Sequence, residues 1–556
     1  MGARGRASLL NAMRLTSLLP LSLLAAVAAA QDAADRVAPR TWTVDGVERS
    51  ALVALPATTP TAAQPAALVF VFHGHGGRSA TAARSFRLHE LLPDAVVVHP
   101  QGLPTPGRLT DPDGKRSGWQ AAIGDQGDRD LRFVDAMLAT LRAELAIDER
   151  RIHATGHSNG GGFTYLLYAA RSEDFASFAP SAAGGVRHLR DGQPIPRPLL
   201  HVAGRNDALV PFATQRRNVD AIIAAVRADA GAPWDAVPGA TVHRGTAGEL
   251  VATWLHDGGH EFPAAAAPAI AAFFRATLKP EPWTTPAAAL PGVVQHVYES
   301  RAARTAVSYH VYLPPGYEDD ADGRRYPVVY WLHGSGGGDA GLPSVARAFE
   351  AAMRRGDLPP SLVVYPNGLP QGMWCDSVDG RRPVETVVLG EIVPRIDAAF
   401  RTLPDAAHRV VAGFSMGGYG ALRFGLARRD LFGAAASLGG GPLQPELTEA
   451  PRTNEARRRE VLQTTYGGDM AEFVARSPWR LAEVHRERLR DARLLLACGA
   501  ADETLPANRG LHERLDALGI PHAYLEPQGV AHEPVRMLQA VGEPMWRLFA
   551  DLFAGR

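Results

Sequence analysis

The sequence predicts an α/β protein with two tandem domains, each a mostly parallel β-sheet covered by helices. Its 556 residues exceed one ordinary domain. Two glycine-rich motifs each occur twice, in the same order, at offsets of 260 and 257 residues, which indicates a duplicated unit. Within each copy, short apolar runs alternate with helical patterns, as is typical of parallel strands joined by helices.

The composition indicates a globular chain without a strongly charged partner. Hydrophobic residues make up 46% and charged residues 21%, which is enough apolar material for large cores. Lys+Arg and Asp+Glu both number 58, so we expect no nucleic-acid partner. The two cysteines exclude a disulfide scaffold, and the histidines lack a ligand pattern such as H-E-x-x-H. We therefore expect no metal and no cofactor.

Residues 1–30 have the pattern of a secretory signal peptide. Arg4, Arg6 and Arg14 come first, and the apolar stretch 15–30 ends in small residues. We expect cleavage near Ala30 and a secreted or periplasmic protein with 55 basic and 58 acidic residues. A membrane anchor is the alternative, but Pro20 interrupts the short apolar run. No later segment is apolar enough to predict stable membrane insertion.

A proline-rich stretch separates the two copies. Four prolines lie between positions 280 and 291, and proline restricts both its own backbone and that of the preceding residue. We expect a semi-rigid linker at 279–291 between domains at 36–278 and 292–556.

Apolar runs predict the strands in both domains, and 3.6-residue periodicity predicts the helices. In the first domain we expect strands at 68–72, 96–99, 152–155, 199–203 and 251–255, and helices at 130–145, 160–170 and 214–228. In the second we expect strands at 308–313, 328–332, 362–365, 410–413, 494–498 and 522–525, and helices at 385–400 and 417–427.

The G-x-S-x-G motifs predict a nucleophilic serine in each domain. Ser158 and Ser415 each lie between a predicted strand and a helix of small residues. Flanking glycines allow the sharp strand-to-helix turn that exposes such a serine above the sheet edge. The alternative is a buried serine in a tight turn.

The upstream HGHGG and HGSGG segments, 73–77 and 333–337, predict the oxyanion holes. A serine that attacks a carbonyl needs N–H donors for the negatively charged oxygen that forms. We assign these donors to the backbone N–H groups of His75 and Asn159 in the first domain, and of Ser335 and Met416 in the second. A glycine-rich turn without a ligand is the alternative.

An acid and then a histidine follow each serine along the chain, in the order that this type of fold requires. Asp207 and His260 come after two later strands of the first domain, and Asp502 and His532 occupy the same places in the second. The competing interpretations are Asp257 or Glu503 as the acid, and His260 as a solvated loop residue.

These motifs resemble two esterase families. The first domain is similar to secreted polyhydroxybutyrate depolymerases and feruloyl esterases through HGHGG, IHATGHSNGGG (152–162), NDALVPF (206–212) and GGH (258–260). The second resembles the putative-esterase family, which includes esterase D, feruloyl and acetyl-xylan esterases and the antigen 85 acyltransferases, through YLPPGYEDD (312–320), YPVVYWLHGSGGG (326–338) and GFSMGGYGA (413–421). The resemblance implies two α/β-hydrolase domains and ester hydrolysis by the serine, aspartate and histidine residues named above.

The expected function is that of a secreted serine esterase that removes feruloyl or acetyl groups from plant polysaccharide. Polyester depolymerisation and acyl transfer are alternatives, and a non-catalytic binding protein on the same scaffold is a third. We expect Trp119 and Trp374 to line the two substrate pockets, with packing inside the protein as the alternative. Cys375 and Cys498 either form a disulfide or remain two buried thiols.

Overall fold

The structure is a computed structural model that describes residues 36–556, except 108, 110, 186–193, 247, 319–322, 340 and 449–451. The expected signal peptide, 1–30, lies outside the described residues. Within the described part of the chain, we find no helix with both the length and the apolar character needed to cross a bilayer.

The first sheet has ten strands in the order β1-β2-β4-β3-β7-β8-β9-β12-β11-β10. The pairs from β4 to β12 are parallel, and the pairs at both edges are antiparallel. The strand bounds are β1 (Val37–Val44), β2 (Val47–Ala54), β3 (Ala66–Phe72), β4 (Val96–Pro100), β7 (Ile147–His157), β8 (Ser177–Ser181), β9 (Leu199–Gly204), β10 (Ala232–Pro233), β11 (Ala240–Arg244) and β12 (Leu250–His256). Short strands β5 (Leu103–Pro104) and β6 (Ser117–Gly118) pair separately.

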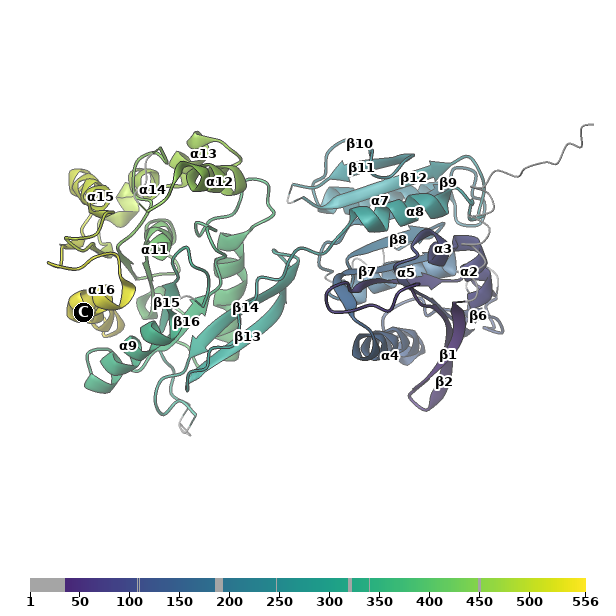
Figure 1. The fold of residues 1–556 in the computed structure, drawn as a ribbon, viewed down its shortest axis with the longest axis horizontal. Coiled ribbons are helices and arrows are strands. Elements are labelled where there is room, and N and C mark those ends of the chain that lie inside the picture. The colour runs from purple at the N-terminus through teal and green to yellow at the C-terminus, as the bar shows by residue number, and fades with distance from the viewer. Residues whose placement is uncertain are drawn as a thin grey trace, which may run out of the picture.

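Helices cover both faces of this sheet (Figure 1). They are α2 (Ser79–Phe86), α3 (Leu88–Leu91), α4 (Arg129–Glu144), α5 (Asn159–Ala170), α7 (Phe212–Ala225) and α8 (Ala266–Ala276). Because side chains alternate along a strand, Phe70 and Phe72 enter one hydrophobic core while Val69 and Val71 enter the other. Two buried faces explain why β3 appears in the sequence as a continuous apolar run.

The second sheet has eight strands in the order β13-β14-β16-β15-β17-β18-β19-β20. It is parallel from β16 onward and begins with an antiparallel hairpin. The bounds are β13 (Val293–Ser300), β14 (Thr305–Tyr312), β15 (Val328–Leu332), β16 (Leu362–Pro366), β17 (Arg409–Phe414), β18 (Ala434–Leu438), β19 (Arg493–Ala497) and β20 (Ala523–Leu525).

Helices also cover both faces of the second sheet, which again separates two hydrophobic cores. They are α9 (Leu342–Arg355), α10 (Val393–Ala399) with a preceding π-helical turn (Thr386–Ile392), α11 (Met416–Ala427), α12 (Glu455–Tyr466), α13 (Met470–Arg476), α14 (Pro478–Val484), α15 (Leu505–Leu518) and α16 (Pro534–Phe553). The predicted fold class, mostly parallel sheets covered by helices, is confirmed.

The expected linker is partly packed against the second sheet. The backbone N–H of Trp283 donates to the Ala306 carbonyl at 2.8 Å, and its own carbonyl accepts from the Ser308 N–H at 2.9 Å. The Trp283 side chain is buried in one of the two hydrophobic cores that flank the second sheet. The middle of this proline-rich segment is therefore anchored to strand β14.

Helix α16 contacts β18, β19 and α9, and substitution of its residue Phe549 tests how much this packing stabilises the fold. Its side chain is fully buried beside Trp546. We expect Phe549→Ala to lower the free energy of unfolding by about 3–5 kcal/mol because it leaves a cavity in the core. Urea denaturation measures the change. The exposed Val484 on α14 provides a control, since Val484→Ala should change stability by less than about 0.5 kcal/mol.

Candidate active site

The two serines occupy nearly identical strand-to-helix turns. Ser158 joins β7 to α5 with φ 58° and ψ −118°, and Ser415 joins β17 to α11 with φ 58° and ψ −121°. Such backbone angles are rare for residues other than glycine and are found at strained functional positions. Strand pairing holds the turns, because the Ser158 N–H donates to the Ser181 carbonyl at 2.9 Å and the Ser415 N–H to Leu438 at 3.0 Å.

Glycine is required where each helix meets the neighbouring strand. A Cβ atom at Gly160 would overlap the Phe72 carbonyl, and one at Gly417 would overlap the Leu332 carbonyl. The second glycine of each motif therefore lets the helix start against the backbone of the central strand. This close approach brings the glycine-rich segment beside the serine.

In the first domain, Ser158, His260 and Asp207 form a continuous hydrogen-bonded series. The Ser158 Oγ lies 2.8 Å from His260 Nε2, and His260 Nδ1 lies 2.9 Å from Asp207 Oδ2. The Asp207 side chain is fully buried, whereas that of His260 is 23% exposed. This geometry allows the histidine to accept the serine proton while the aspartate orients its ring.

The surroundings of Asp207 favour its carboxylate form. Burial raises the pKa of Asp207, but hydrogen bonds from His260 and from the backbone N–H groups of Val210 and Leu209 outweigh burial and lower it. Gln215 on α7 also donates to Asp207 Oδ2 at 2.8 Å. The carboxylate therefore remains charged opposite the imidazole.

The second domain repeats the arrangement with different supporting residues. Ser415 Oγ lies 2.9 Å from His532 Nε2, and His532 Nδ1 lies 2.7 Å from Asp502 Oδ2. Burial raises the pKa of Asp502, but hydrogen bonds from His532 and from the Thr504 backbone and hydroxyl more than compensate and lower it. Both Thr504 groups donate to Asp502 Oδ1 at 2.8 Å.

The competing acids lie in different surroundings. The Asp257 side chain is 94% exposed and faces Arg205, and Glu503 forms an ion pair with Arg452. In the first domain the acid that contacts His260 is Asp207, and in the second the acid that contacts His532 is Asp502. The structure thus brings together the serine, acid and histidine that the sequence predicts in each domain.

The predicted oxyanion donors lie next to the serines. Asn159 and Met416 are the first residues of α5 and α11, where backbone N–H groups have no partner within the helix. The glycine-rich segments pass close by, since a Cβ at Gly74 would lie 3.5 Å from the Ser158 Cβ and one at Gly334 would lie 3.4 Å from the Ser415 Cβ. Assignment of the second donor to His75 and Ser335 stays a prediction.

A histidine at the start of each glycine-rich segment holds its loop. His73 Nδ1 donates to the Gly74 carbonyl at 2.8 Å, while its Nε2 accepts from the Gly102 N–H at 3.0 Å. His333 makes the same pair of bonds, to the Gly334 carbonyl and from the Gly368 N–H. Burial lowers the pKa of both rings, that of His333 to about 4, and only a neutral ring donates and accepts in this way.

The expectation that Trp119 and Trp374 line substrate pockets is wrong, because both side chains are fully buried in the cores. The Trp119 indole N–H donates to the His73 carbonyl at 2.8 Å, and that of Trp374 donates to the His333 carbonyl at 3.3 Å. Each buried tryptophan therefore anchors the start of a glycine-rich segment through its indole N–H. The side chain of Asn159 adds a further link, since its Oδ1 accepts from the backbone N–H of Trp119 at 2.8 Å.

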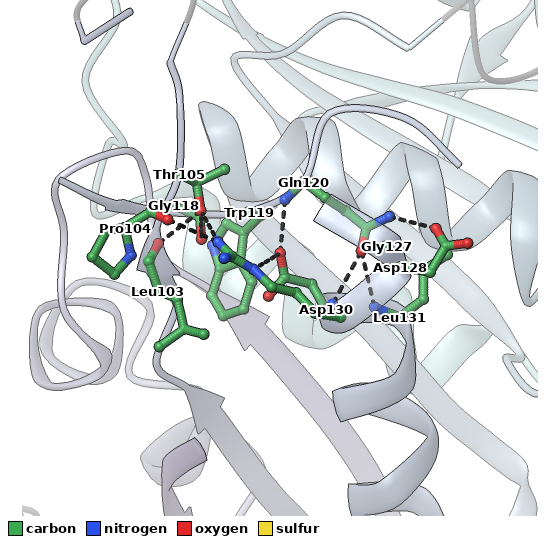
Figure 2. Close-up of polar contacts among 12 residues, drawn as sticks. Leu103, Pro104, Thr105, Gly118, Trp119, Gln120, Gly127, Asp128, Asp130 and Leu131 are labelled. Carbon is green, nitrogen blue, oxygen red and sulfur yellow. Dashed lines mark hydrogen bonds and ion pairs between the residues drawn. The ribbon is translucent and has the colours of Figure 1, made fainter. Parts of the chain in front are cut away.

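A buried polar network holds the segment that carries Trp119 (Figure 2). Gln120 Oε1 accepts from the Asp130 N–H at 3.0 Å, and Asp130 Oδ2 accepts from the Gln120 N–H at 2.8 Å. Asp130 also pairs with the buried Arg49 at 2.8 Å, and Thr105 donates to the Gly118 carbonyl. These bonds fix the loop after β6, which in turn positions Trp119 under the first site.

A pocket of about 460 Å³ opens at Ser415. Ser335 and Met416, the predicted oxyanion residues, lie in its wall beside the serine. The lining combines apolar and polar residues. The apolar ones are Met373, Pro442, Leu443, Leu447, Val461 and Ala507, and the polar ones include Gln371, Gln444, Arg452, Thr453, Asn454, Arg457, Arg458 and Thr504. Met373, rather than the adjacent Trp374, contributes to this wall.

The two cysteines are separate, buried thiols. Cys375 Sγ contacts the Tyr466 hydroxyl at 3.9 Å, and Cys498 Sγ lies 3.5 Å from the Thr504 hydroxyl. Burial raises the pKa of the Cys498 thiol to about 12. Of the two interpretations of the sequence, the structure has the buried thiols.

Several supporting residues have no signal in the sequence. Gln215 and Thr504 hold the acids, and the ring of His157, which directly precedes Ser158, lies 5.2 Å from that of His260. Burial lowers the pKa of His157 to about 4, so this ring is neutral beside His260. Thr504 lies two residues after the acid, but Gln215 reaches Asp207 only through the packing of α7.

Residues 300–524 match the family model described as "Putative esterase". Among curated proteins, an esterase of Mycobacterium tuberculosis is 31% identical over 246 residues, which cover 40% of this chain and 51% of that protein. The chain thus spans about half the length of that relative. A protein of Aspergillus clavatus named probable feruloyl esterase C is 31% identical over 145 residues, 26% of this chain and 50% of its own.

A protein of Xylanibacter ruminicola named endo-1,4-beta-xylanase/feruloyl esterase is 32% identical over 169 residues, which cover 29% of this chain and 23% of that protein. Among solved structures, a ferulic acid esterase covers 47% of this chain and 98% of its own at 21% identity, with a TM-score of 0.41. An S-formylglutathione hydrolase from Staphylococcus aureus covers 46% and 98% at 19% identity, with a TM-score of 0.38.

The lowered pKa of Asp502 predicts an acid-dependent loss of stability. A carboxyl whose pKa is lower in the folded than in the unfolded state stabilises the fold above its unfolded pKa of about 3.9, and this contribution is lost as the pH falls through the folded pKa. We expect Asp502→Asn to be less stable than the wild type at neutral pH and to lose less stability between about pH 5 and about pH 2.

Urea midpoints measured across this pH range test the prediction. Asp491, whose side chain is 85% exposed, provides the matched control. Asp491→Asn should follow the wild-type pH profile. An Asp502→Asn profile parallel to that of the wild type would show that the Asp502 carboxyl does not contribute.

Proposed function

We propose that the protein is a serine carboxylic-ester hydrolase with two catalytic sites, Ser158–His260–Asp207 and Ser415–His532–Asp502. The observation that carries the proposal is the repeated pair of hydrogen bonds, serine to histidine at 2.8 and 2.9 Å and histidine to aspartate at 2.9 and 2.7 Å. The putative-esterase match over residues 300–524 supports the same reaction class for the second site.

The geometry supports a two-step reaction through an acyl-enzyme. The histidine Nε2 takes the serine proton as Oγ attacks the ester carbonyl carbon, and the aspartate stabilises the resulting imidazolium. Backbone N–H groups at the helix start hold the negatively charged oxygen. The histidine then returns the proton to the leaving alcohol, and a water activated by the same nitrogen releases the acid and restores the serine.

The pocket at Ser415 favours an ester with an aromatic acyl group. The apolar residues of its lining, which include Met373, Leu443 and Leu447, suit the ring of a feruloyl group. The polar residues of the lining, which include Gln444 and Arg457, suit the ring substituents or the sugar hydroxyls of a polysaccharide. Relatives of this chain carry the name feruloyl esterase, which agrees with that choice. Acetyl esters of plant polysaccharide are the other substrate class within this proposal.

The remaining parts of the proposal concern the whole chain. We place the two catalytic units at 36–278 and 292–556, joined by 279–291, in a protein exported after removal of residues 1–30. Polyester depolymerisation shares the same catalytic groups, and acyl transfer differs only in that an alcohol replaces water in the second step. Product analysis with and without an added alcohol separates hydrolysis from transfer.

Alanine variants of the serines test both sites within the full chain. We expect Ser158→Ala and Ser415→Ala each to abolish one share of p-nitrophenyl acetate turnover, and the double variant to lose at least about 10³-fold, because the nucleophile is gone. A fluorophosphonate probe should label the wild type at two positions and each single variant at one. Ser344→Ala, on the surface helix α9, should retain full activity. An unlabelled and inactive wild type would contradict the proposal.

Pocket filling tests the aromatic acyl group. Gln444 lines the pocket and is partly exposed, whereas Glu446, two residues later, is exposed and not in the described lining. In the Ser158→Ala background, Gln444→Trp should reduce kcat/KM for methyl ferulate by about tenfold and change that for methyl acetate by less than about threefold, because only the larger acyl group meets the new ring.

Glu446→Trp is the matched control and should leave kcat/KM for both esters unchanged. Equal losses on the two esters in Gln444→Trp would show that the pocket does not select the acyl group. Release of ferulate from feruloylated arabinoxylan and of acetate from acetylated xylan by each single-serine variant then assigns a substrate to each site.

A further inference from the structure

Three potential metal ligands converge in the second domain, at the junction of α15 and β20. His512 and Asp516 are four residues apart on α15, so they share one face of the helix, and His522 directly precedes β20. His512 Nδ1 lies 2.8 Å from His522 Nε2. The Asp516 carboxylate lies 3.6 Å from His512 Nε2 and 4.0 Å from His522 Nε2.

The backbone and a neighbouring ring hold both imidazoles in place. His522 Nδ1 lies 2.9 Å from the Ile520 carbonyl, which can only accept, so Nδ1 carries the proton and Nε2 presents a lone pair to the other two residues. This second-sphere bond from one ring nitrogen to a carbonyl is the usual support of a metal-bound histidine. The ring of His512 stacks on Tyr524 with centroids 4.1 Å apart and an angle of 9°.

The ligand set and its exposure fit a transition-metal ion. One donor atom from each of the three residues lies within 4.8 Å of the other two. Zinc binds imidazole nitrogen and carboxylate oxygen at about 2.0–2.2 Å, so donors around one tetrahedral ion lie roughly 3.3–3.6 Å apart and the Asp516 carboxylate must move inward. The Asp516 side chain is 64% exposed and can rotate inward, whereas that of His522 is only 2% exposed and already positioned.

We propose that His512, Asp516 and His522 bind one Zn²⁺ ion, with solvent at the remaining coordination position. Two imidazoles disfavour Mg²⁺ and Ca²⁺, which prefer oxygen ligands throughout. Sequence spacing predicts no metal here, because the set spans the end of a helix and forms only when the chain turns back at Gly519. The proposal does not depend on the esterase reaction.

Such an ion would join two elements that lead to the Ser415 site. Helix α15 begins directly after Thr504, which donates to Asp502, and the chain continues from β20 to His532. Zinc at the far end of α15 would therefore connect the end of this helix to the strand before His532. The three residues would have a structural role in this position, without contact with the reacting atoms.

Metal binding to the full chain tests the proposal. After dialysis against EDTA and re-addition of zinc sulfate, elemental analysis of the gel-filtered wild type should give one zinc per chain, and the melting temperature should rise. Cobalt substitution should give the visible absorption of a four-coordinate site. Asp516→Asn and His522→Ala should each weaken zinc binding by at least about tenfold and abolish the melting shift.

His408→Ala is the matched control, because His408 pairs with Asp405 at 2.8 Å without a third donor in the described surroundings. It should bind zinc as the wild type does. Asp516 is exposed, so Asp516→Asn keeps the proposal testable even if His522→Ala fails to fold. A wild type without bound zinc, or an Asp516→Asn variant with unchanged zinc affinity and melting shift, would overturn the assignment.

Discussion

The contact between a helix start and the backbone of the neighbouring strand sets the geometry of both sites. At Gly160 and at Gly417 this approach leaves no room for a side chain. The serine two residues before each glycine has a positive φ. The same contact aligns the first N–H groups of α5 and α11 with the glycine-rich segment of the adjacent strand. Nucleophile, helix start and loop therefore share one fixed arrangement.

Both domains have this arrangement, but different residues support the acid in each. A buried histidine and a buried tryptophan anchor the glycine-rich segment in both, through the same carbonyl and N–H groups. The acids differ, since Gln215 from a helix supports Asp207 whereas the nearby Thr504 supports Asp502. The duplicated framework thus coexists with different residues around the two acids.

Local patterns predicted the strand-to-helix turns at the two serines, the order of the catalytic groups and the central strands, because each depends on residues close in sequence. The sequence did not predict the edge strands β1, β10 and β13 or their neighbours β2 and β11, since strands that are exposed on one side or very short lack a continuous apolar run. Strands β8 and β18 escaped because their small residues have weak strand preference. The roles of Trp119 and Trp374 could not be predicted, because they depend on which backbone carbonyl each indole contacts in the folded protein.

The buried thiols have a practical consequence. The fold contains no covalent cross-link between Cys375 and Cys498, so a reducing environment removes nothing that stabilises it. With the pKa of Cys498 raised to about 12, its thiolate is scarce at neutral pH, and alkylating reagents react slowly with the closed protein. Because this sulfur touches Thr504, the rate of its modification reports how often the loop that carries Asp502 opens. The second domain thus contains its own probe of local unfolding at the active site.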